Sequence, residues 1–104
     1  MSAYRLIVQP EAEEDMLAAR QWYEGQREGL GKRFIAAIDD ALGQIARIPL
    51  TFPIAYKECR QYIVRRFPYV IYYLVGDDQV SVIGVFHGRR DPQAWQQRID
   101  ELTP

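Results

Sequence analysis

The chain has 104 residues, a single cysteine and a net charge of −1, with 48% hydrophobic and 26% charged residues. This size and composition predict one folded domain over residues 1–104 and disfavour a disordered chain. Cys59 has no partner for an internal disulfide, and no apolar run approaches the roughly 20 residues that cross a bilayer. We expect a cytoplasmic protein without a membrane segment. One cysteine and one histidine also argue against a zinc site, so we expect neither metal nor cofactor.

The first half of the chain predicts a strand followed by two helices. Residues 4–8 are rich in β-forming side chains, and Pro10 with the acidic residues after it suits a helix N-terminus. Helices are predicted over residues 10–25 and 30–48, joined by a glycine-containing turn into an αα-hairpin. The apolar face of the second helix consists of Leu30, Phe34, Ile38, Ala41, Leu42, Ile45 and Ile48.

The second half predicts three strands, over residues 62–67, 69–75 and 80–87, with a hairpin turn at residues 76–79. The alternation of a strand divides the last of these into two faces: Val80, Val82, Gly84 and Phe86 on one side, and Ser81, Ile83, Val85 and His87 on the other. Because both faces are largely apolar, we expect a central strand that is covered on both sides.

A short helix is predicted to close the chain. Asp91 is a suitable N-cap and Pro92 a suitable first helical residue, and Trp95, Ile99 and Leu102 form the inward stripe. The helices are segregated from a run of hairpin-joined strands. The fold class is therefore α+β: an N-terminal strand, an αα-hairpin, then a largely antiparallel sheet with a short C-terminal helix.

Charge is unevenly distributed along the chain. Residues 57–98 contain seven Lys or Arg against four Asp or Glu, although the whole chain is slightly acidic. A general nucleic-acid binder usually carries a strong basic excess, which this chain lacks. The arginine-rich half suits an acidic partner or a few phosphates.

Six short segments, in this order, resemble the RelE/ParE toxin superfamily of type II toxin–antitoxin systems. They are Pro10-Glu11-Ala12, Trp22-Tyr23, Gly29-Leu30-Gly31 with Phe34, Ile48-Pro49 with Phe52-Pro53, the run from Arg65 to Tyr73, and Val85-Phe86-His87-Gly88-Arg89-Arg90-Asp91-Pro92 with Trp95. The last segment is nearer the ParE branch. The resemblance covers essentially the whole chain and implies a cytoplasmic α+β toxin that a cognate, ParD-like antitoxin wraps and neutralises.

The resemblance implies two alternative activities. ParE-like members are taken to inhibit DNA gyrase by protein–protein contact and belong to plasmid stabilisation systems. RelE-like members are ribosome-dependent endoribonucleases that cleave mRNA. A third alternative is a degenerate member without toxicity.

His87 is the titratable candidate for chemistry, because its ordinary pKa lies near neutrality. Metal-free RNA cleavage needs a base for the 2′-hydroxyl, cations for the phosphate and an acid for the leaving oxygen. If the chain is a ribonuclease, His87 and Arg65 are the catalytic candidates. His87 also ends a strand just before Gly88, where its ring can hydrogen-bond the backbone and order the bend.

The residues expected to contact the target or the antitoxin are Arg65, Arg66, Tyr72, His87, Arg89 and Arg90. Arginine binds carboxylates and phosphates bidentately, and tyrosine stacks on bases. Adjacent strand residues point to opposite faces, so Arg65 and Arg66 are predicted not to line one site together. No tyrosine and no basic tail follow Arg90, and the overall charge is low. These features favour gyrase inhibition over RNA cleavage.

Overall fold

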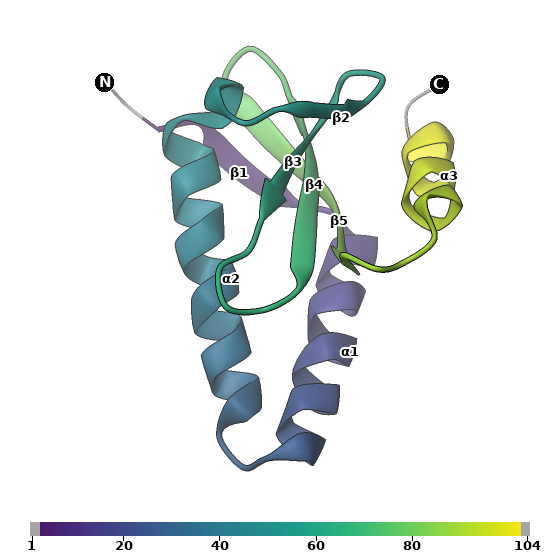
Figure 1. Cartoon of the computed structure of the whole chain (residues 1–104). Helices are drawn as coiled ribbons and strands as arrows, with labels where there is room; N and C mark the ends of the chain where they lie inside the picture. Colours follow the sequence, from purple (N-terminus) through teal and green to yellow (C-terminus); the bar gives the residue numbers. More distant parts are fainter. Residues whose placement is uncertain (1–2, 103–104) are drawn as a thin grey trace.

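The computed structural model describes residues 3–102, and within them a five-stranded sheet carries helices on both faces (Figure 1). The elements are β1 (Arg5–Val8), α1 (Pro10–Gln26), α2 (Leu30–Arg47), the 3-10 helix η1 (Pro49–Thr51), β2 (Ile54–Tyr56), β3 (Cys59–Ile63), β4 (Tyr69–Val75), β5 (Gln79–His87) and α3 (Pro92–Leu102). The strand order is β1-β5-β4-β3-β2. Only the β1–β5 pair is parallel, which confirms an α+β fold with a largely antiparallel sheet. Within residues 3–102, no helix is long and apolar enough to cross a membrane.

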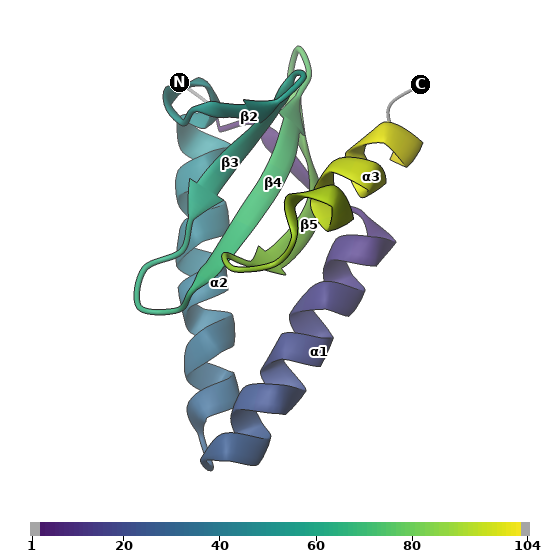
Figure 2. The same ribbon diagram turned by 45° about the vertical axis from the view of Figure 1, so that its right-hand side comes forward.

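The αα-hairpin covers one face of the sheet, as the helical spacing predicts. Ile38 and Phe34 of α2 are fully buried against β4 and β5, together with Tyr23 of α1. The tip of the hairpin extends beyond the end of the sheet (Figures 1 and 2).

The turn at the hairpin tip is held by a side chain of α1. The Glu24 carboxylate accepts the backbone N–H groups of Gly29 and Gly31, each at 3.0 Å. Gly29 has a φ of 86°, a conformation that glycine adopts without strain. The two backbone hydrogen bonds lower the pKa of Glu24 and satisfy N–H groups that the start of α2 would otherwise leave unpaired.

The helix α3 packs on the opposite face of the sheet (Figure 2). The Trp95 ring stacks on the Tyr72 ring with centroids 4.4 Å apart, and Ile99 is 1% exposed. The predicted inward stripe of Trp95, Ile99 and Leu102 is confirmed, because all three pack in this second apolar cluster.

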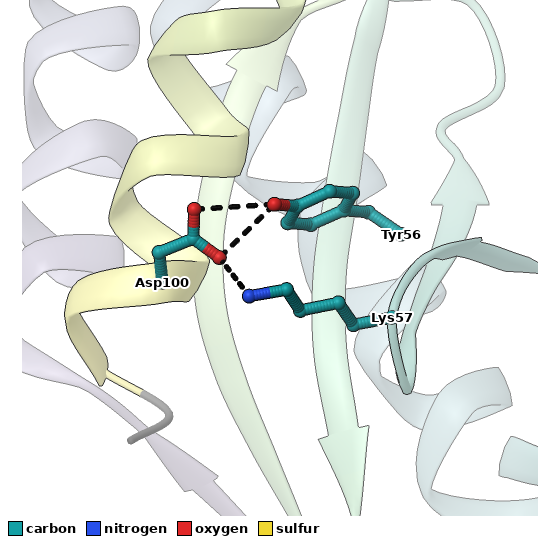
Figure 3. Close-up of polar contacts among 3 residues, drawn as sticks. All are labelled: Tyr56, Lys57 and Asp100. Atoms are coloured by element: carbon teal, nitrogen blue, oxygen red, sulfur yellow. Dashed lines mark hydrogen bonds and ion pairs between the residues drawn. The ribbon is translucent and has the colours of Figure 1, made fainter.

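Two ion pairs fix α3 to the rest of the fold. Asp15 of α1 binds Arg98 through both carboxylate oxygens, and the same carboxylate accepts the backbone N–H of Val85 at 2.9 Å. Two residues further along α3, Asp100 accepts hydrogen bonds from Tyr56, at the end of β2, and from Lys57, in the β2–β3 turn (Figure 3). The position of α3 is therefore set from two sides.

A β-bulge changes the predicted faces of β5. Tyr72 lies opposite Gly84 and Tyr73 opposite Val82, so Ile83 is an extra residue without an opposite partner. Strict alternation is therefore wrong beyond Val82. The face toward the hairpin is Val80, Val82 and Val85, and the face toward α3 includes Ile83, Gly84 and Phe86.

The predicted strand over residues 62–67 is also wrong in its bounds. β3 spans Cys59–Ile63, and residues 64–68 form a loop in which Tyr69 donates its N–H to Phe67. Arg66 has a φ of 72°, which a strand does not permit. A short strand that the sequence did not indicate, β2, pairs with the first part of β3.

Candidate functional site

Two loops meet at one end of the sheet. The β3–β4 loop covers residues 64–68, and the β5–α3 turn covers residues 88–91. Gly88 donates its N–H to the Pro68 carbonyl at 2.7 Å, and Tyr69 lies opposite His87 in the β4–β5 ladder. The two segments that supply most of the candidate residues are therefore adjacent in space.

This end of the molecule carries four exposed arginines, Arg65, Arg66, Arg89 and Arg90, which we call the arginine end. The ion pairs found within residues 3–102 join Lys57 to Asp100 and Arg98 to Asp15, and none involves these four side chains. The arginine end thus presents positive charge that the described part of the chain does not neutralise.

A groove of about 680 Å³ lies between α2 and the β3–β4 loop. Its lining residues are Leu30, Arg33, Ala36, Ala37, Asp40, Ala41, Tyr62, Arg65, Arg66 and Phe67. The prediction that Arg65 and Arg66 cannot line one site is wrong. They lie in a loop rather than a strand, and both border this groove with Arg33 of α2. Asp40 is the carboxylate in the lining.

His87 is half-buried at the end of β5. Its Nδ1 accepts the backbone N–H of Arg89 at 3.1 Å, and its ring meets the Tyr69 ring edge-on with centroids 5.4 Å apart. With Nδ1 as acceptor, the neutral ring carries its proton on Nε2. The geometry gives His87 the turn-ordering contact that the sequence offered as an alternative to catalysis.

Arg90 and Asp91 complete this turn. The Arg90 guanidinium lies 5.4 Å from the Phe86 ring centroid, within cation–π distance. Asp91 accepts the N–H of Gln93 at 3.0 Å, which confirms its predicted role as the N-cap of α3.

Tyr72 does not reach the surface. It is 5% exposed beneath Trp95, and burial raises the pKa of its hydroxyl to about 12. A tyrosine ring in this position can neither stack on a nucleic-acid base nor donate a proton to a substrate. The predicted contact at Tyr72 therefore has no exposed ring to support it in this structure.

The loop residues Lys57 and Glu58 lie at the other end of the sheet. Arg60 is opposite Tyr73, so Glu58 falls near Val75, whereas His87 is opposite Tyr69. At roughly 3.3 Å per residue, the length of β4 separates the two ends by about 20 Å. Lys57 is also bound to Asp100. These groups cannot act together with His87.

Sequence reasoning missed Arg33 and the Asp15–Arg98 pair. Arg33 lies on α2, far in sequence from the arginines that it joins, and Asp15 and Arg98 are 83 residues apart. No local spacing indicates such contacts. As to metal ions, residues 3–102 contain no group of three or more His, Cys, Asp or Glu that could bind one.

A family model for the ParE toxin of type II toxin–antitoxin systems, parDE, matches residues 6–92, which spans both the helical hairpin and the arginine end. The chain belongs to this family. Toxin ParE2 of Mycobacterium tuberculosis is 25% identical to the chain over 100 residues, covering 95% of each protein.

Solved structures share the fold of this ParE-family chain. One, titled the chromosomal ParDE toxin–antitoxin system from P. aeruginosa, aligns with a TM-score of 0.65 at 14% identity, covering 82% of this chain and 96% of the other. Another, the toxin–antitoxin complex RelBE2 from Mycobacterium tuberculosis, aligns with a TM-score of 0.60 at 21% identity, covering 88% and 97%. Because both a ParDE and a RelBE system share the fold, the fold alone does not separate the two branches.

Proposed function

We propose that this toxin inhibits DNA gyrase by protein–protein contact through its arginine end and catalyses no reaction of its own. The observation that carries the proposal is the combination of four arginines that form no ion pair within residues 3–102 with a histidine whose Nδ1 is already hydrogen-bonded. The setting would be the cytoplasm. A ParD-like antitoxin encoded beside the toxin would neutralise it, as in a plasmid stabilisation system.

The hydrogen bonding of His87 disfavours a role for this residue in RNA cleavage. A general base needs an unprotonated nitrogen facing the substrate, but the Arg89 N–H occupies Nδ1 and places the ring proton on Nε2. If the ring were protonated to act as an acid, Nδ1 would carry its own N–H. That N–H would point at the backbone N–H of Arg89, and the two donors would repel each other. Neither Tyr72 nor Glu58 can supply an acid or a base beside His87, because Tyr72 is buried and Glu58 lies at the far end of the sheet.

The second candidate is a RelE-like, ribosome-dependent mRNA endoribonuclease. The observation in its favour is that Arg65, Arg66, Arg89 and Arg90 lie on two loops next to His87, where several guanidinium groups can hold a phosphate. In this alternative, Arg65 and His87 would be the catalytic residues.

Purified toxin added separately to a gyrase supercoiling reaction and to cell-free translation tests the proposal. We expect loss of supercoiling and unchanged translation. Arrest of translation with cuts in the mRNA, and normal supercoiling, would contradict the proposal and support the ribonuclease. No effect in either reaction would also contradict it and indicate a degenerate toxin.

A further inference from the structure

Trp22 is a large aromatic residue on the surface of α1. It is 59% exposed, and its ring meets the Tyr23 ring edge-on with centroids 5.1 Å apart. About one turn away on either side, Ala18 and Gly25 are exposed and too small to cover the indole ring. A Cβ atom added at Gly25 would meet nothing within 4 Å. Much of the indole ring is therefore accessible to a partner.

The path of α1 brings Trp22 toward the end of β5. Asp15 projects from the same side of α1 as Trp22, because the seven residues between these positions make nearly two helical turns. Asp15 accepts the backbone N–H of Val85, so this side of α1 lies against the last part of β5. The helix then continues past the end of β5 toward the tip of the hairpin (Figure 2). Trp22 therefore lies about 10 Å further along α1 than Asp15, on the side that faces the end of β5.

A series of ring contacts connects Trp22 with the arginine end. Tyr23 meets Tyr69 edge-on with centroids 6.1 Å apart, and Tyr69 meets His87 in the same way at 5.4 Å. Burial raises the pKa of the Tyr69 hydroxyl, and the positive charge of Arg90 acts on this pKa in the opposite direction. Arg90 therefore lies within electrostatic reach of Tyr69. The exposed indole and the arginines of the β5–α3 turn belong to the same region of the molecule.

We propose that Trp22 is the apolar anchor of the contact with DNA gyrase, and that Arg89 and Arg90 bind carboxylates of gyrase beside it. A single exposed aromatic residue is ordinary on a protein surface. A tryptophan beside arginines that form no ion pair within residues 3–102 is instead typical of the residues that dominate binding energy in protein interfaces. The charge of these arginines favours acidic groups on the partner, and the indole favours an apolar side chain. The inference rests on the proposed function, because it names side chains through which gyrase would be bound.

The charge of α1 favours a protein over a nucleic acid as the occupant of this surface. Besides Asp15, which is paired with Arg98, the helix carries one arginine and the four glutamates Glu11, Glu13, Glu14 and Glu24. A DNA strand that stacked a base on Trp22 would bring its phosphates close to this acidic helix, which is unfavourable. A protein surface can instead place an apolar side chain on the indole and separate carboxylates on the arginines of the β5–α3 turn.

The test compares Trp22 variants with a matched control in a gyrase supercoiling reaction. Trp22→Ala removes the indole and should weaken inhibition by about tenfold or more, as expected for the loss of an aromatic anchor. Trp22→Phe keeps an aromatic ring and should stay within about threefold of wild type. The control is Leu17→Ala, because Leu17 is 54% exposed on another side of the same helix, and this variant should inhibit like the wild type. Melting temperatures close to that of the wild type would show that all three variants are folded.

Titration of the same variants with the full-length polypeptide encoded beside this gene, and with duplex DNA, separates the other occupants. The affinity of Trp22→Ala for the polypeptide should stay within about threefold of wild type, and a loss as large as the loss of gyrase inhibition would overturn the assignment of Trp22 to gyrase. Binding of DNA without gyrase, or a dimer of the toxin alone, that Trp22→Ala abolishes would also overturn it.

The supercoiling reaction distinguishes failure of the anchor from failure of the proposed function. Unchanged inhibition by a folded Trp22→Ala protein would overturn the anchor and leave gyrase inhibition intact. Absence of inhibition by the wild-type toxin would instead overturn the proposed function.

Discussion

At the scale of single residues, His87 and Tyr72 make specific contacts that bear on the roles their chemistry suggests. His87 is an ordinary candidate for acid–base work until its Nδ1 is seen to accept the N–H of Arg89. Tyr72 is a candidate for base contact until Trp95 covers it. Side-chain identity names both residues as candidates, but only the three-dimensional contacts show which nitrogen and which ring are available.

The tautomer of His87 is a direct test of this contact. We expect the neutral ring to carry its proton on Nε2, because Nδ1 accepts a backbone N–H. Nitrogen chemical shifts of the imidazole, measured by NMR at a pH where the ring is neutral, distinguish the two tautomers. A proton on Nδ1 would contradict the described turn and return His87 to the set of possible general bases.

At the scale of elements, the αα-hairpin is the part of the fold that the sequence predicts best. Its apolar face has regular helical spacing, and Phe34, Ile38, Ala41 and Ile45 are all buried as that spacing indicates. The start of α1 at Pro10 follows from the fixed φ of proline and the acidic first turn.

Substitution of Ile38 tests the packing of α2. Ile38 is 1% exposed, so Ile38→Ala should lower the free energy of unfolding by about 2–5 kcal/mol. Leu42→Ala should cost less, because Leu42 is only partly buried at the margin of the core. Leu17→Ala on the exposed side of α1 is the matched control and should cost less than about 0.5 kcal/mol. Denaturant unfolding measures all three, and equal losses for Ile38 and Leu17 would show that the wrong face is inward.

The hairpin turn should carry a pH dependence through Glu24. Its folded pKa is lowered by the N–H groups of Gly29 and Gly31, so its contribution to stability is present above its ordinary pKa and lost as pH falls through the folded value. Glu24→Gln should therefore lower the melting temperature at neutral pH, and this difference should shrink progressively as the pH falls below the ordinary glutamate pKa of about 4.3. Glu28→Gln, on the same turn, is the control. A Glu24→Gln effect that persists undiminished in acid would rule out a charge-dependent cap.

The strands were less predictable than the helices for physical reasons. Arg60 and Gln61 are polar enough to suggest a loop, yet they belong to β3 because they pair with Tyr73 and Tyr72 of β4. Residues 64–67 have the composition of a strand but form a loop. The Val64 N–H donates to the Tyr69 carbonyl and closes a tight turn that contains Pro68. A simple two-residue period likewise does not predict the bulge at Ile83. Strand bounds depend on partners that a linear pattern does not contain.

At the scale of the whole molecule, charge is arranged so that one end is basic although the chain is slightly acidic overall. The Asp15–Arg98 and Lys57–Asp100 ion pairs fix α3, while the arginines of the two adjoining loops form no ion pair in the described part of the chain. Sequence predicted the arginine-rich half, but the meeting of the two loops depends on the pairing of Tyr69 with His87. This distribution of charge supports the proposal that the protein binds a partner at the arginine end.

The most direct test of this account is inhibition of gyrase supercoiling by two folded variants compared with the wild type. Arg89→Ala combined with Arg90→Ala removes charge from the arginine end and should weaken inhibition by at least about tenfold. His87→Gln should inhibit within about threefold of wild type, because contact requires no proton transfer, whereas loss of a catalytic acid or base would cost roughly 10²–10⁴-fold. Full inhibition by the double arginine variant, with inhibition abolished in a folded His87→Gln protein, would contradict the account.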